Sequence, residues 1–458
     1  MFGKTKKIHF IGIGGIGMSG MAELLNELGF IITGSDLENS ERLKHLKTKG
    51  IKVNIGHHAS NVNNCDVIVY SSAIKTNNIE IITGNAKKIP TIRRAEMLSE
   101  LLKIKKISIA IAGTHGKTTT CSMLGCILSE ANFEPTLVIG GIVNKFQSNT
   151  ISGKGDIIVV EADEFDKTFL TLKPTLNLIT NLDLEHLDCY ENLSDLKKSF
   201  IEFANAVPFY GKVAICIDHE NTSSILLKIK RPLITFGINE KAEIRASNLF
   251  FNKNHSSFDL FVNNKKIETI NIQVPGKHNI TNALGAIALA LTLDIPISKI
   301  KTGLSNYNGV RRRFEIKFIL KNETMIVDDY AHHPSEVSST LTAAKNGWNK
   351  RIISIFQPHL FTRTRDFYEE FAKAFLKTDV LIITDIYAGR EKPIPGITAE
   401  LISNKALEMG HKNVKFIQNK ENIPNKLLDI VNPNDIIITM GAGDIWRQCK
   451  KIYEVLNN

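Results

Sequence analysis

The chain has 458 residues, more than one hydrophobic core usually supports, so three domains are the starting expectation. Its 43% hydrophobic and 23% charged residues are typical of a globular protein and exclude a disordered or fibrous chain. The formal charge of +10 could fit a polyanionic partner, but the lysines and arginines are scattered along the sequence. We therefore predict small anionic ligands and no nucleic-acid partner.

The six cysteines show no C-x-x-C spacing, which predicts reduced thiols and neither disulfides nor structural zinc. Near the N-terminus, three lysines precede an apolar stretch from 8 to 21, but its glycines indicate a strand, a loop and a helix rather than a signal peptide. No apolar stretch reaches the ~18 residues that a membrane span needs. We expect a soluble, cytoplasmic protein without a membrane partner.

Short β-branched runs alternate with amphipathic segments in the first part of the chain. The predicted elements cover residues 7–13, 19–28, 30–33, 40–49, 66–70 and 94–102. Such alternation is typical of βαβ units and a parallel sheet. It predicts a Rossmann-like N-terminal domain, which we place at residues 1–104.

A second alternating series starts with a strand at 107–112, after a charged segment. Further strands are predicted at 156–160 and 176–179, and a helix at 280–293. Between them, residues 244–274 contain short alternating strands with polar turns such as Asn263-Asn264, which favours an antiparallel patch. We expect a P-loop ATPase-like central domain over residues 105–312.

A third series follows, with strands predicted at 325–327, 352–355, 380–383 and 435–439. Segments long enough for helices separate these strands, so this part is predicted to be a second Rossmann-like domain, residues 313–458. The predicted fold class is α/β, with three consecutive domains.

A glycine pattern lies between the first predicted strand and the first predicted helix. Gly12, Gly14 and Gly17 are spaced as G-x-G-x-x-G, and Asp36 ends the next predicted strand nineteen residues after Gly17. Glycines there let a backbone approach a pyrophosphate at a helix N-terminus, while the acid can bind a ribose hydroxyl. The pattern predicts a phosphate-bearing nucleotide without identifying nicotinamide. Glycines that serve only a tight turn remain the alternative.

A second phosphate-binding pattern follows the strand at 107–112, where residues 112–119 read AGTHGKTT. Its position between a strand and a helix is that of a P-loop, in which backbone N–H groups bind phosphates. We expect Lys117 to contact the β- and γ-phosphates of ATP and Thr118 to bind Mg²⁺. A strict Walker A pattern would have glycine at position 111, where this chain has Ile111, so the loop is a shortened variant.

A P-loop needs a carboxylate on a neighbouring strand to hold its metal ion. Glu161 is predicted at the carboxyl end of the strand at 156–160, where ligands bind in open α/β sheets. His186 follows the strand at 176–179 and would lie at the same edge. An isolated loop histidine is more often structural, so its spacing alone does not make it a ligand.

The motifs of the chain resemble those of the Mur ligase family. Those that carry the resemblance are HFIGIGGIGMSGMAELL, YSSAI, IPTIRRAEML, AGTHGKTTT, VVEADEFD, EHLD, PGKHNITNALGAIA, RRRFE, DDYAHHP, QPHLFTRT and MGAGDI. They occur in the family order over nearly the whole chain. The resemblance implies an ATP-dependent ligase that forms an amide bond through an acyl phosphate in cell-wall synthesis. The GIGGIGMSG opening is similar to the member that adds L-alanine to UDP-N-acetylmuramate, and less to the ligase that recycles murein peptides.

The resemblance also implies a role for each matching residue. The UDP-sugar would be bound by Gly12, Gly14, Gly15, Gly17, Asp36, Ser71 and Ser72. ATP would be bound by Gly113, Thr114, His115, Gly116, Lys117, Thr118, Thr119, Asn279, Asn282, Arg313 and Asp329. Mg²⁺ would be held by Thr118, Glu161 and His186, and the amino acid by His332, His359 and Arg363. The catalytic set is then Lys117, Glu161, His186, Arg313 and Asp329.

One position departs from many relatives, because the histidine of the QPH segment is followed by Leu360 and not by arginine. If both arginines of such relatives bind the amino acid carboxylate, one contact is missing here or is supplied elsewhere. We expect a monomer or weak homodimer. Two alternatives to a ligase remain at this stage: an NAD-dependent dehydrogenase, from the first glycine pattern alone, and a nucleotide-dependent binding protein without catalysis.

Overall fold

The computed structural model describes residues 3–183, 190–389 and 391–457. The chain divides into two compact units by its internal contacts. The first unit comprises residues 1–247, 259–270 and 281–307, and the second comprises residues 248–258, 271–280 and 308–458. Among the described residues, no helix has both the length and the apolar character of a membrane-spanning segment.

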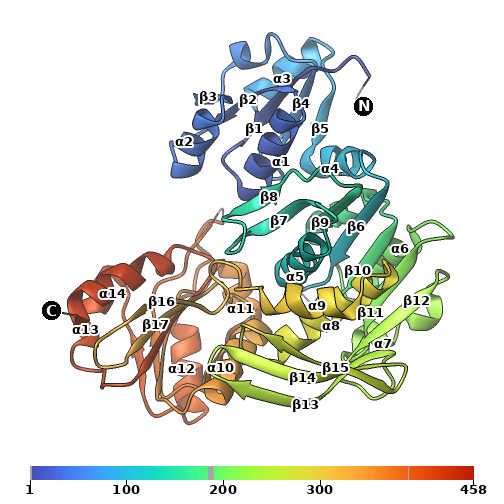
Figure 1. Cartoon of the computed structure of the whole chain (residues 1–458). Helices are drawn as coiled ribbons and strands as arrows, with labels where there is room; N and C mark the ends of the chain where they lie inside the picture. The colour runs from blue at the N-terminus through green and yellow to red at the C-terminus, as the bar shows by residue number, and fades with distance from the viewer. Residues whose placement is uncertain (1–2, 184–189, 390, 458) are drawn as a thin grey trace. The chain divides into compact units, whose positions relative to one another are not determined.

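The N-terminal part of the first unit is a five-stranded parallel sheet with the order β3-β2-β1-β4-β5 (Figure 1). Its elements are β1 (Lys7–Ile11), α1 (Ile16–Glu27), β2 (Ile31–Asp36), α2 (Glu41–Thr48), β3 (Lys52–Ile55), η1 (Ala59–Val62), β4 (Val67–Tyr70), α3 (Ile79–Ala86), β5 (Thr91–Arg93) and α4 (Arg94–Leu102). This strand order is that of a doubly wound nucleotide-binding sheet. The predicted Rossmann-like arrangement is confirmed.

Helix α1 begins three residues before the predicted start at residue 19. Gly17 and Gly20 are both helical, although glycine is a weak helix former, and side chains of other elements pack closely against both positions. A Cβ atom at Gly20 would lie 2.0 Å from Thr150 Oγ1, and one at Gly17 would lie 2.6 Å from Arg94 Nη1. Tertiary packing therefore outweighs local propensity in the first turns of α1.

The central part of the chain is built on a ten-stranded sheet with the order β15-β14-β13-β12-β11-β10-β6-β9-β7-β8. Most of this part belongs to the first unit, but residues 248–258 and 271–280 belong to the second. Its strands are β6 (Ile107–Ala112), β7 (Thr136–Val143), β8 (Ser148–Ile151), β9 (Ile157–Glu161), β10 (Leu176–Ile179), β11 (Lys212–Cys216), β12 (Leu233–Gly237), β13 (Ile244–Asn252), β14 (His255–Val262) and β15 (Lys265–Ile272). The helices are α5 (Lys117–Glu130), η2 (Phe165–Thr171), α6 (Leu193–Asn205), α7 (Glu220–Ser223), η3 (Leu226–Lys228), α8 (Lys277–Thr292) and α9 (Ile297–Ser305).

Helix α5 is buried from Thr118 to Leu128 and packs against β6, β7, β9 and α9. A helix buried on all sides belongs to the core and has little freedom to move. The loop before α5 is therefore anchored to a helix of the hydrophobic core. This helix and the parallel strands beside it provide the scaffold that a P-loop requires.

The predicted antiparallel patch corresponds to β13, β14 and β15. Two-residue connections join β13 to β14 and β14 to β15, and such short connections link antiparallel neighbours. The second connection is Asn263-Asn264, with φ of 48° and 65°. Positive φ at both central residues is the conformation of a type I′ hairpin turn. The α/β fold class, with parallel sheets and antiparallel pairs, is confirmed.

The second unit contains a six-stranded sheet with the order β16-β17-β21-β18-β19-β20, in which β16 is antiparallel to β17 and the other pairs are parallel. Its elements are β16 (Glu315–Ile319), β17 (Met325–Asp329), α10 (Pro334–Gly347), β18 (Ile352–Phe356), α11 (Phe361–Phe375), β19 (Val380–Ile383), α12 (Glu400–Glu408), β20 (Val414–Phe416), η4 (Lys420–Asn422), α13 (Ile423–Leu427), β21 (Ile436–Met440), η5 (Ile445–Arg447) and α14 (Gln448–Leu456). The four predicted strands of this part are β17, β18, β19 and β21.

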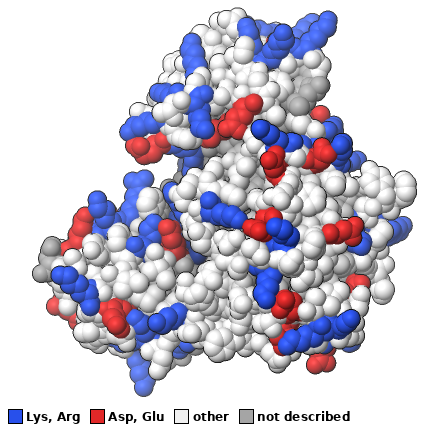
Figure 2. Space-filling view, viewed as in Figure 1, with Lys and Arg blue, Asp and Glu red and all other residues white. Residues whose placement is uncertain are grey.

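Charged side chains of both signs are spread over the face of the molecule shown in Figure 2. Lysines and arginines on that face form several separate groups and do not cover one continuous region. This distribution agrees with the scattered basic residues of the sequence.

The Asn263-Asn264 turn allows a test of the hairpin. Replacing Asn264 by Val places a β-branched side chain at positive φ, which should cost about 1–2 kcal/mol and lower the melting temperature. Replacing Asn264 by Gly should not lower it, because glycine adopts this conformation freely. Thermal unfolding followed by circular dichroism would measure both changes. Lys265→Val is the matched control, because it puts the same side chain in the adjacent strand; equal melting temperatures for the two Val variants would contradict the assigned turn.

Candidate active site

The first glycine loop joins β1 to α1 and is held by residues of β2. The amides of Gly12 and Ile13 both donate to the carbonyl oxygen of Ser35, at 2.9 and 3.1 Å. The amide of Gly14 donates to Asp36 Oδ2 at 2.7 Å. Gly12 has a φ of 75°, and a Cβ atom at Gly14 would lie 2.8 Å from the Asp36 carboxylate. Asp36 thus shapes the loop itself, in addition to the ribose contact expected from the sequence.

Other predicted residues of this site lie beside the loop. Ser71 follows β4, and its hydroxyl would be 3.1 Å from a Cβ atom at Gly12. Ser72 follows it and is exposed, and Gly15 is the N-cap residue of α1. Arg42 was not predicted, but its Nη1 donates to the carbonyl oxygen of Gly14 at 2.8 Å. The structure brings the predicted serines and glycines to one edge of the sheet.

The second glycine loop joins β6 to α5 as the sequence predicts. Ile111 is fully buried inside β6, so the loop starts only at Gly113, which confirms the shortened form. Gly113 and Gly116 have φ of 132° and 83°. A Cβ atom at Gly116 would lie 2.3 Å from Asn282 Oδ1, so the predicted nucleotide residue Asn282 packs directly against the loop.

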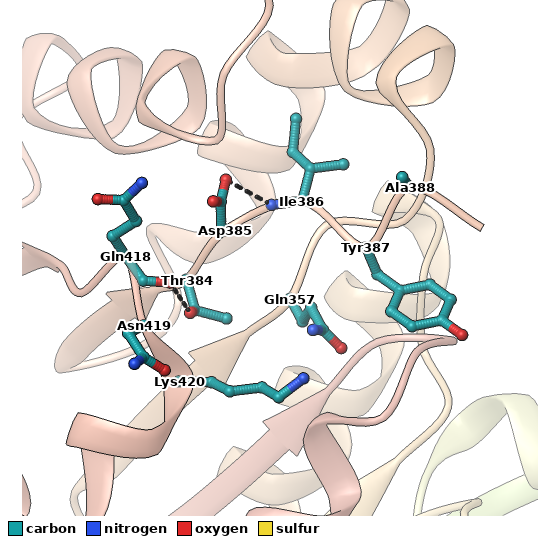
Figure 3. A pocket seen from close by; sticks show the side chains of 9 residues that line it. All are labelled: Gln357, Thr384, Asp385, Ile386, Tyr387, Ala388, Gln418, Asn419 and Lys420. Atoms are coloured by element: carbon teal, nitrogen blue, oxygen red, sulfur yellow. Dashed lines mark hydrogen bonds between the residues drawn. The ribbon is translucent and has the colours of Figure 1, made fainter. Parts of the chain in front are cut away.

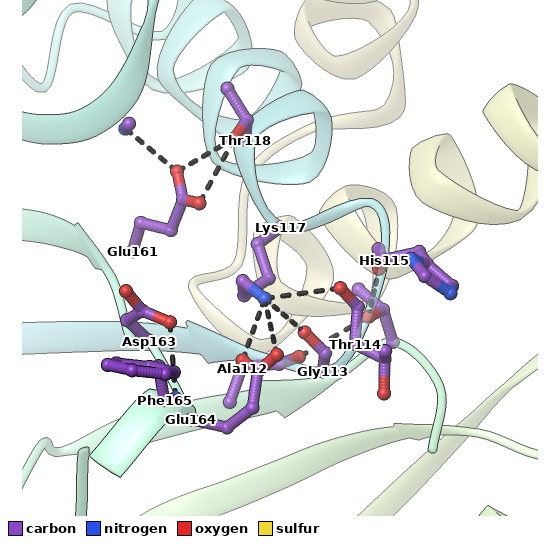
Figure 4. A network of polar contacts seen from close by, with 12 residues as sticks. Ala112, Gly113, Thr114, His115, Lys117, Thr118, Glu161, Asp163, Glu164 and Phe165 are labelled. Atoms are coloured by element: carbon purple, nitrogen blue, oxygen red, sulfur yellow. Dashed lines mark hydrogen bonds and ion pairs between the residues drawn. The ribbon is translucent and has the colours of Figure 1, made fainter. Parts of the chain in front are cut away.

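Lys117 is the central cation of this loop (Figure 4). Its Nζ donates to the carbonyl oxygen of Gly113 at 2.7 Å and to Glu164 Oε2 at 2.7 Å. Burial alone would lower the pKa of Lys117, but Glu164, Asp163 and Glu161 together raise it above its usual value. Lys117 is therefore held protonated. Only 1% of the Glu164 side chain is exposed, so this carboxylate is the buried countercharge of Lys117.

Glu164 was missed by the sequence reasoning. The acidic run from 161 to 164 was interpreted only through Glu161, because that residue ends the strand. The signal in the sequence was a run of carboxylates directly after β9. The strand β9 pairs with β6, which leads into the loop that contains the buried lysine. A buried lysine needs a countercharge, and this requirement could have identified the acidic run as its source.

Thr118 and Glu161 form the expected pair for a metal ion. Thr118 Oγ1 donates to the two carboxylate oxygens of Glu161, at 2.9 and 3.1 Å, and the amide of Gly140 donates to Glu161 Oε2 at 2.8 Å. A hydroxyl and a carboxylate are the oxygen ligands that Mg²⁺ accepts. In the described residues there is no cluster of three or more His, Cys, Asp or Glu side chains that could hold a metal. The third predicted ligand, His186, lies outside the described residues.

The other polar residues of the loop are tied to the chain that follows β10. Thr114 Oγ1 and the backbone of Asp183 exchange hydrogen bonds, and His115 Nε2 lies 3.3 Å from Asp183 Oδ2. His219 Nε2 lies 2.9 Å from the second oxygen of Asp183. Burial by itself would raise the pKa of Asp183, but the two histidines hold this pKa well below its usual range. Thr119 is buried in the first turn of α5. Asp183 and His219 were not predicted.

Three predicted nucleotide residues lie in the second unit. Arg313 Nη1 pairs with Glu336 Oε1 at 3.1 Å. Asp329, at the end of β17, accepts hydrogen bonds from the amides of Phe314 and Ala331, at 2.7 and 2.8 Å. Burial raises the pKa of Asp329 to about 6, although the charge of Arg313 and the two amides oppose the rise. The third is Asn279, at the start of α8.

Asn279 Nδ2 donates to the carbonyl oxygen of Pro275 at 2.7 Å. This bond fixes the side chain in the first turn of α8. The predicted nucleotide residues of the second unit are thus each held by identified partners.

The predicted amino acid residues follow β17 and β18. The rings of His332 and His359 are in contact, with centroids 6.1 Å apart. The ring of Tyr330 lies against that of His332, with centroids 5.0 Å apart. Leu360 has a φ of 72°, which is unusual for a residue with a Cβ atom, and its amide donates to the carbonyl oxygen of Tyr387 at 3.0 Å. The structure therefore brings His332 and His359 together.

A pocket of about 240 Å³ opens beside this group, at the carboxyl ends of β18, β19 and β20 (Figure 3). Its lining residues are Gln357, Thr384, Asp385, Ile386, Tyr387, Ala388, Gln418, Asn419 and Lys420. Tyr387 also stacks on His359, with centroids 5.9 Å apart. Lys420 pairs with Asp444 at 2.6 Å, so its charge is balanced within the protein. Tyr387 connects the pocket with the predicted amino acid group and was not predicted.

Comparison with known proteins agrees with this arrangement. Family models for the Mur ligase family catalytic domain, the Mur ligase middle domain and the Mur ligase glutamate ligase domain match residues 7–106, 111–290 and 312–443. The chain is 46% identical to the UDP-N-acetylmuramate–L-alanine ligase of Pelobacter propionicus, over 100% of this chain and 99% of that protein. It is 45% identical to the ligase of the same name from Geotalea uraniireducens, again over 100% and 99%.

Solved structures give the same result. The fold matches that of UDP-N-acetylmuramate-alanine ligase MurC from Thermotoga maritima with a TM-score of 0.83 and 30% identity, over 98% of each chain. A murein peptide ligase from Psychrobacter arcticus matches with a TM-score of 0.72 and 23% identity, over 99% of each chain, which shows the shared fold. From its full-length similarity to these enzymes and its three family matches, the chain belongs to the Mur ligase family.

Proposed function

We propose that this protein joins L-alanine to the carboxylate of UDP-N-acetylmuramate with the consumption of ATP, in peptidoglycan synthesis. The observation that carries the proposal is the loop from β6 to α5, with Lys117 buried against Glu164 and Thr118 paired with Glu161. The full-length similarity to ligases named for this reaction supports the choice of substrates. Neither a dehydrogenase nor a non-catalytic nucleotide-binding protein has comparable support.

The chemistry requires ATP because a carboxylate is a poor electrophile. In the proposed reaction a carboxylate oxygen of UDP-N-acetylmuramate attacks the γ-phosphorus, and ADP leaves. The amine of L-alanine then attacks the carbonyl carbon of the acyl phosphate and loses a proton. The bond between this carbon and the phosphate oxygen breaks, and inorganic phosphate leaves. The protein contributes mainly by placing these groups and by balancing charge.

We assign the ATP end of the reaction to the loop of residues 113–119, with Asn279, Asn282, Arg313 and Asp329. Lys117 supplies the positive charge next to the transferred phosphate, as a P-loop lysine does. Thr118 and Glu161 would hold Mg²⁺, together with His186, and the ion would neutralise phosphate charge. The pairing of the Thr118 hydroxyl with Glu161 supports this assignment.

We assign the other two substrates to the remaining groups. The pyrophosphate of the UDP-sugar would lie against the loop of residues 12–17, beside Asp36, Ser71 and Ser72, at the N-terminus of α1. The carboxylate of L-alanine would be bound near His332, His359 and Arg363. The proposal includes a cytoplasmic location, where nucleotide substrates are made. The proposed domain ranges are 1–104 for the UDP-sugar, 105–312 for most of the ATP-binding residues, and 313–458 for the amino acid together with Arg313 and Asp329.

An assay of ADP release tests the proposed function. With ATP, Mg²⁺ and UDP-N-acetylmuramate present, ADP should form in step with product when L-alanine is added. Without L-alanine, release should be limited to the acyl phosphate step and should produce no amide. Replacing L-alanine by glycine or L-serine would measure amino acid selectivity. Reduction of added NAD⁺ or NADP⁺ by any of these substrates, without ADP release, would contradict a ligase.

Lys117→Ala should abolish ligation but leave the affinity for UDP-N-acetylmuramate nearly unchanged. The reason is that Lys117 lies in the loop after β6, whereas the proposed UDP loop follows β1. A product assay and calorimetry would measure the two quantities. Lys106→Ala is the matched control, because this lysine precedes β6 and pairs with Asp156 at the surface. A parallel loss of UDP-sugar affinity in Lys117→Ala would contradict separate sites for the two nucleotides.

Arg363→Ala should raise the apparent KM for L-alanine at least tenfold and leave the KM for ATP nearly unchanged. A charge-assisted hydrogen bond to a carboxylate contributes about 1.5–3 kcal/mol, which corresponds to roughly ten- to a hundredfold in affinity. Leu360→Arg should lower the KM for L-alanine if a second arginine contact is vacant. Steady-state kinetics with each substrate varied in turn would measure these changes.

The matched control for this pair of variants is Arg365→Ala. Arg365 lies on the same helix, is half exposed and pairs with Asp366 at 2.6 Å. Arg365→Ala should leave the KM for L-alanine and the KM for ATP unchanged. A rise in the KM for ATP in Arg363→Ala, with the KM for L-alanine unaltered, would assign Arg363 to the nucleotide site.

A further inference from the structure

A buried acidic group in the N-terminal part of the chain has no role in the proposed chemistry. Glu80, in the first turn of α3, is fully buried. Its Oε2 accepts a hydrogen bond from Ser35 Oγ at 2.7 Å and lies 3.3 Å from His9 Nε2. Its Oε1 accepts from Asn61 Nδ2 at 2.6 Å and from the amide of His58 at 3.1 Å. One carboxylate thus joins β1, β2, η1 and the chain before η1 to helix α3.

These contacts keep Glu80 ionised. Burial by itself would raise its pKa, but the hydrogen bonds from His9, Ser35 and Asn61 lower the pKa to about 2. A second histidine, His57, lies 3.0 Å from Ser35 Oγ through Nδ1 and 3.7 Å from Glu80 Oε2. Burying an ionised carboxylate is costly unless its partners are all in place. A group of this kind strongly favours one arrangement of the elements that contact it.

The arrangement that Glu80 favours includes the first glycine loop. Ser35, whose hydroxyl binds Glu80, is the residue whose carbonyl oxygen accepts hydrogen bonds from the amides of Gly12 and Ile13. The next residue, Asp36, accepts the amide of Gly14. Fixing the side chain of Ser35 therefore fixes the backbone that orients the loop. His9, the other close partner, lies on β1, the strand that leads into the loop.

We propose that Glu80 is a positioning residue for the diphosphate of the UDP substrate, acting through Ser35 on the loop of residues 12–17. The proposal rests on the proposed function, because it takes that loop as the site of the UDP-sugar. A glycine loop is flexible by itself, and binding a diphosphate to a mobile loop costs the entropy of ordering it. Glu80 reduces this cost before the ligand binds, because it holds Ser35, whose carbonyl oxygen accepts hydrogen bonds from the loop.

Glu80→Gln tests the proposal, because it keeps the size of the side chain and removes its charge. Loss of a charge-assisted contact predicts a weakening of UDP and UDP-N-acetylmuramate binding by about ten- to a hundredfold. The kcat at saturating substrate and the KM for ATP should stay unchanged. Calorimetry with UDP alone provides a readout that does not need ligase activity. A rise in the KM for ATP equal to that for the UDP-sugar would overturn the positioning role.

Two further variants separate positioning from simple loss of stability. Ile81→Ala removes a buried apolar side chain from the same helix, in a cluster with Ile11, Val62 and Ile68, and leaves the carboxylate untouched. It should lower the melting temperature without weakening UDP binding. Ser35→Ala should reproduce part of the loss of UDP affinity seen in Glu80→Gln. The double variant should bind UDP as tightly as Glu80→Gln alone.

The outcomes distinguish this proposal from the proposed function. If the wild-type protein ligates L-alanine and Glu80→Gln binds UDP as tightly as the wild type, only the role of Glu80 is wrong. The positioning role would also be overturned if Ile81→Ala, with a melting temperature equal to that of Glu80→Gln, weakened UDP binding. If the wild-type protein binds no UDP compound, the assignment of the loop fails together with the role of Glu80. Should Glu80→Gln not fold, Ser35→Ala carries the test, and unchanged UDP binding in that variant overturns the proposal.

Discussion

The arrangement of every candidate site follows from one geometric constraint: parallel strands of a sheet all end at the same edge. Side chains that follow neighbouring strands therefore meet, although they are far apart in the sequence. The first sheet places Asp36 and Ser71 beside the first glycine loop in this way, and the ten-stranded sheet places Glu161 beside the second. In the third sheet, His332 and His359 follow different strands and their rings are in contact. The succession of βαβ units therefore brings the residues of each candidate site together.

Charge balance at the second glycine loop sets the conditions for nucleotide binding. Lys117 is surrounded by the carboxylates of Glu161, Asp163 and Glu164, whose combined effect is to keep it protonated. A triphosphate brought next to these carboxylates would be repelled unless cations accompany it. Under the proposed function, this would be the physical reason why Thr118 and Glu161 hold an Mg²⁺ ion, which would supply the compensating positive charge. It also means that Lys117 must exchange at least part of its contact with Glu164 for a phosphate.

Much of the fold could be predicted from the sequence because its local signals agree with its tertiary structure. The segments at 94–102, 107–112 and 176–179 were predicted with the bounds that the structure shows, since each has a clear period or a short β-branched run. The strands that were missed are β3, β5, β7, β8, β11, β12, β16 and β20. The residues missed at the sites, such as Glu164 and Glu80, have partners 47 and 71 positions away, and no local pattern marks such pairs. Motifs identify loops, whereas countercharges and supporting contacts depend on the folded structure.

The two glycine loops are stabilised in different ways, and the difference has a functional consequence. In the first loop the amides of Gly12 and Gly14 donate to the carbonyl oxygen of Ser35 and to the carboxylate of Asp36. In the second loop the lysine itself folds back on the carbonyl oxygen of Gly113 and on Glu164, so a phosphate has to replace a partner. Under the proposed function, the first loop is preorganised for a diphosphate, whereas the second would exchange an ion pair for a phosphate. Binding at the second loop should consequently depend on metal ions and ionic strength more steeply than binding at the first.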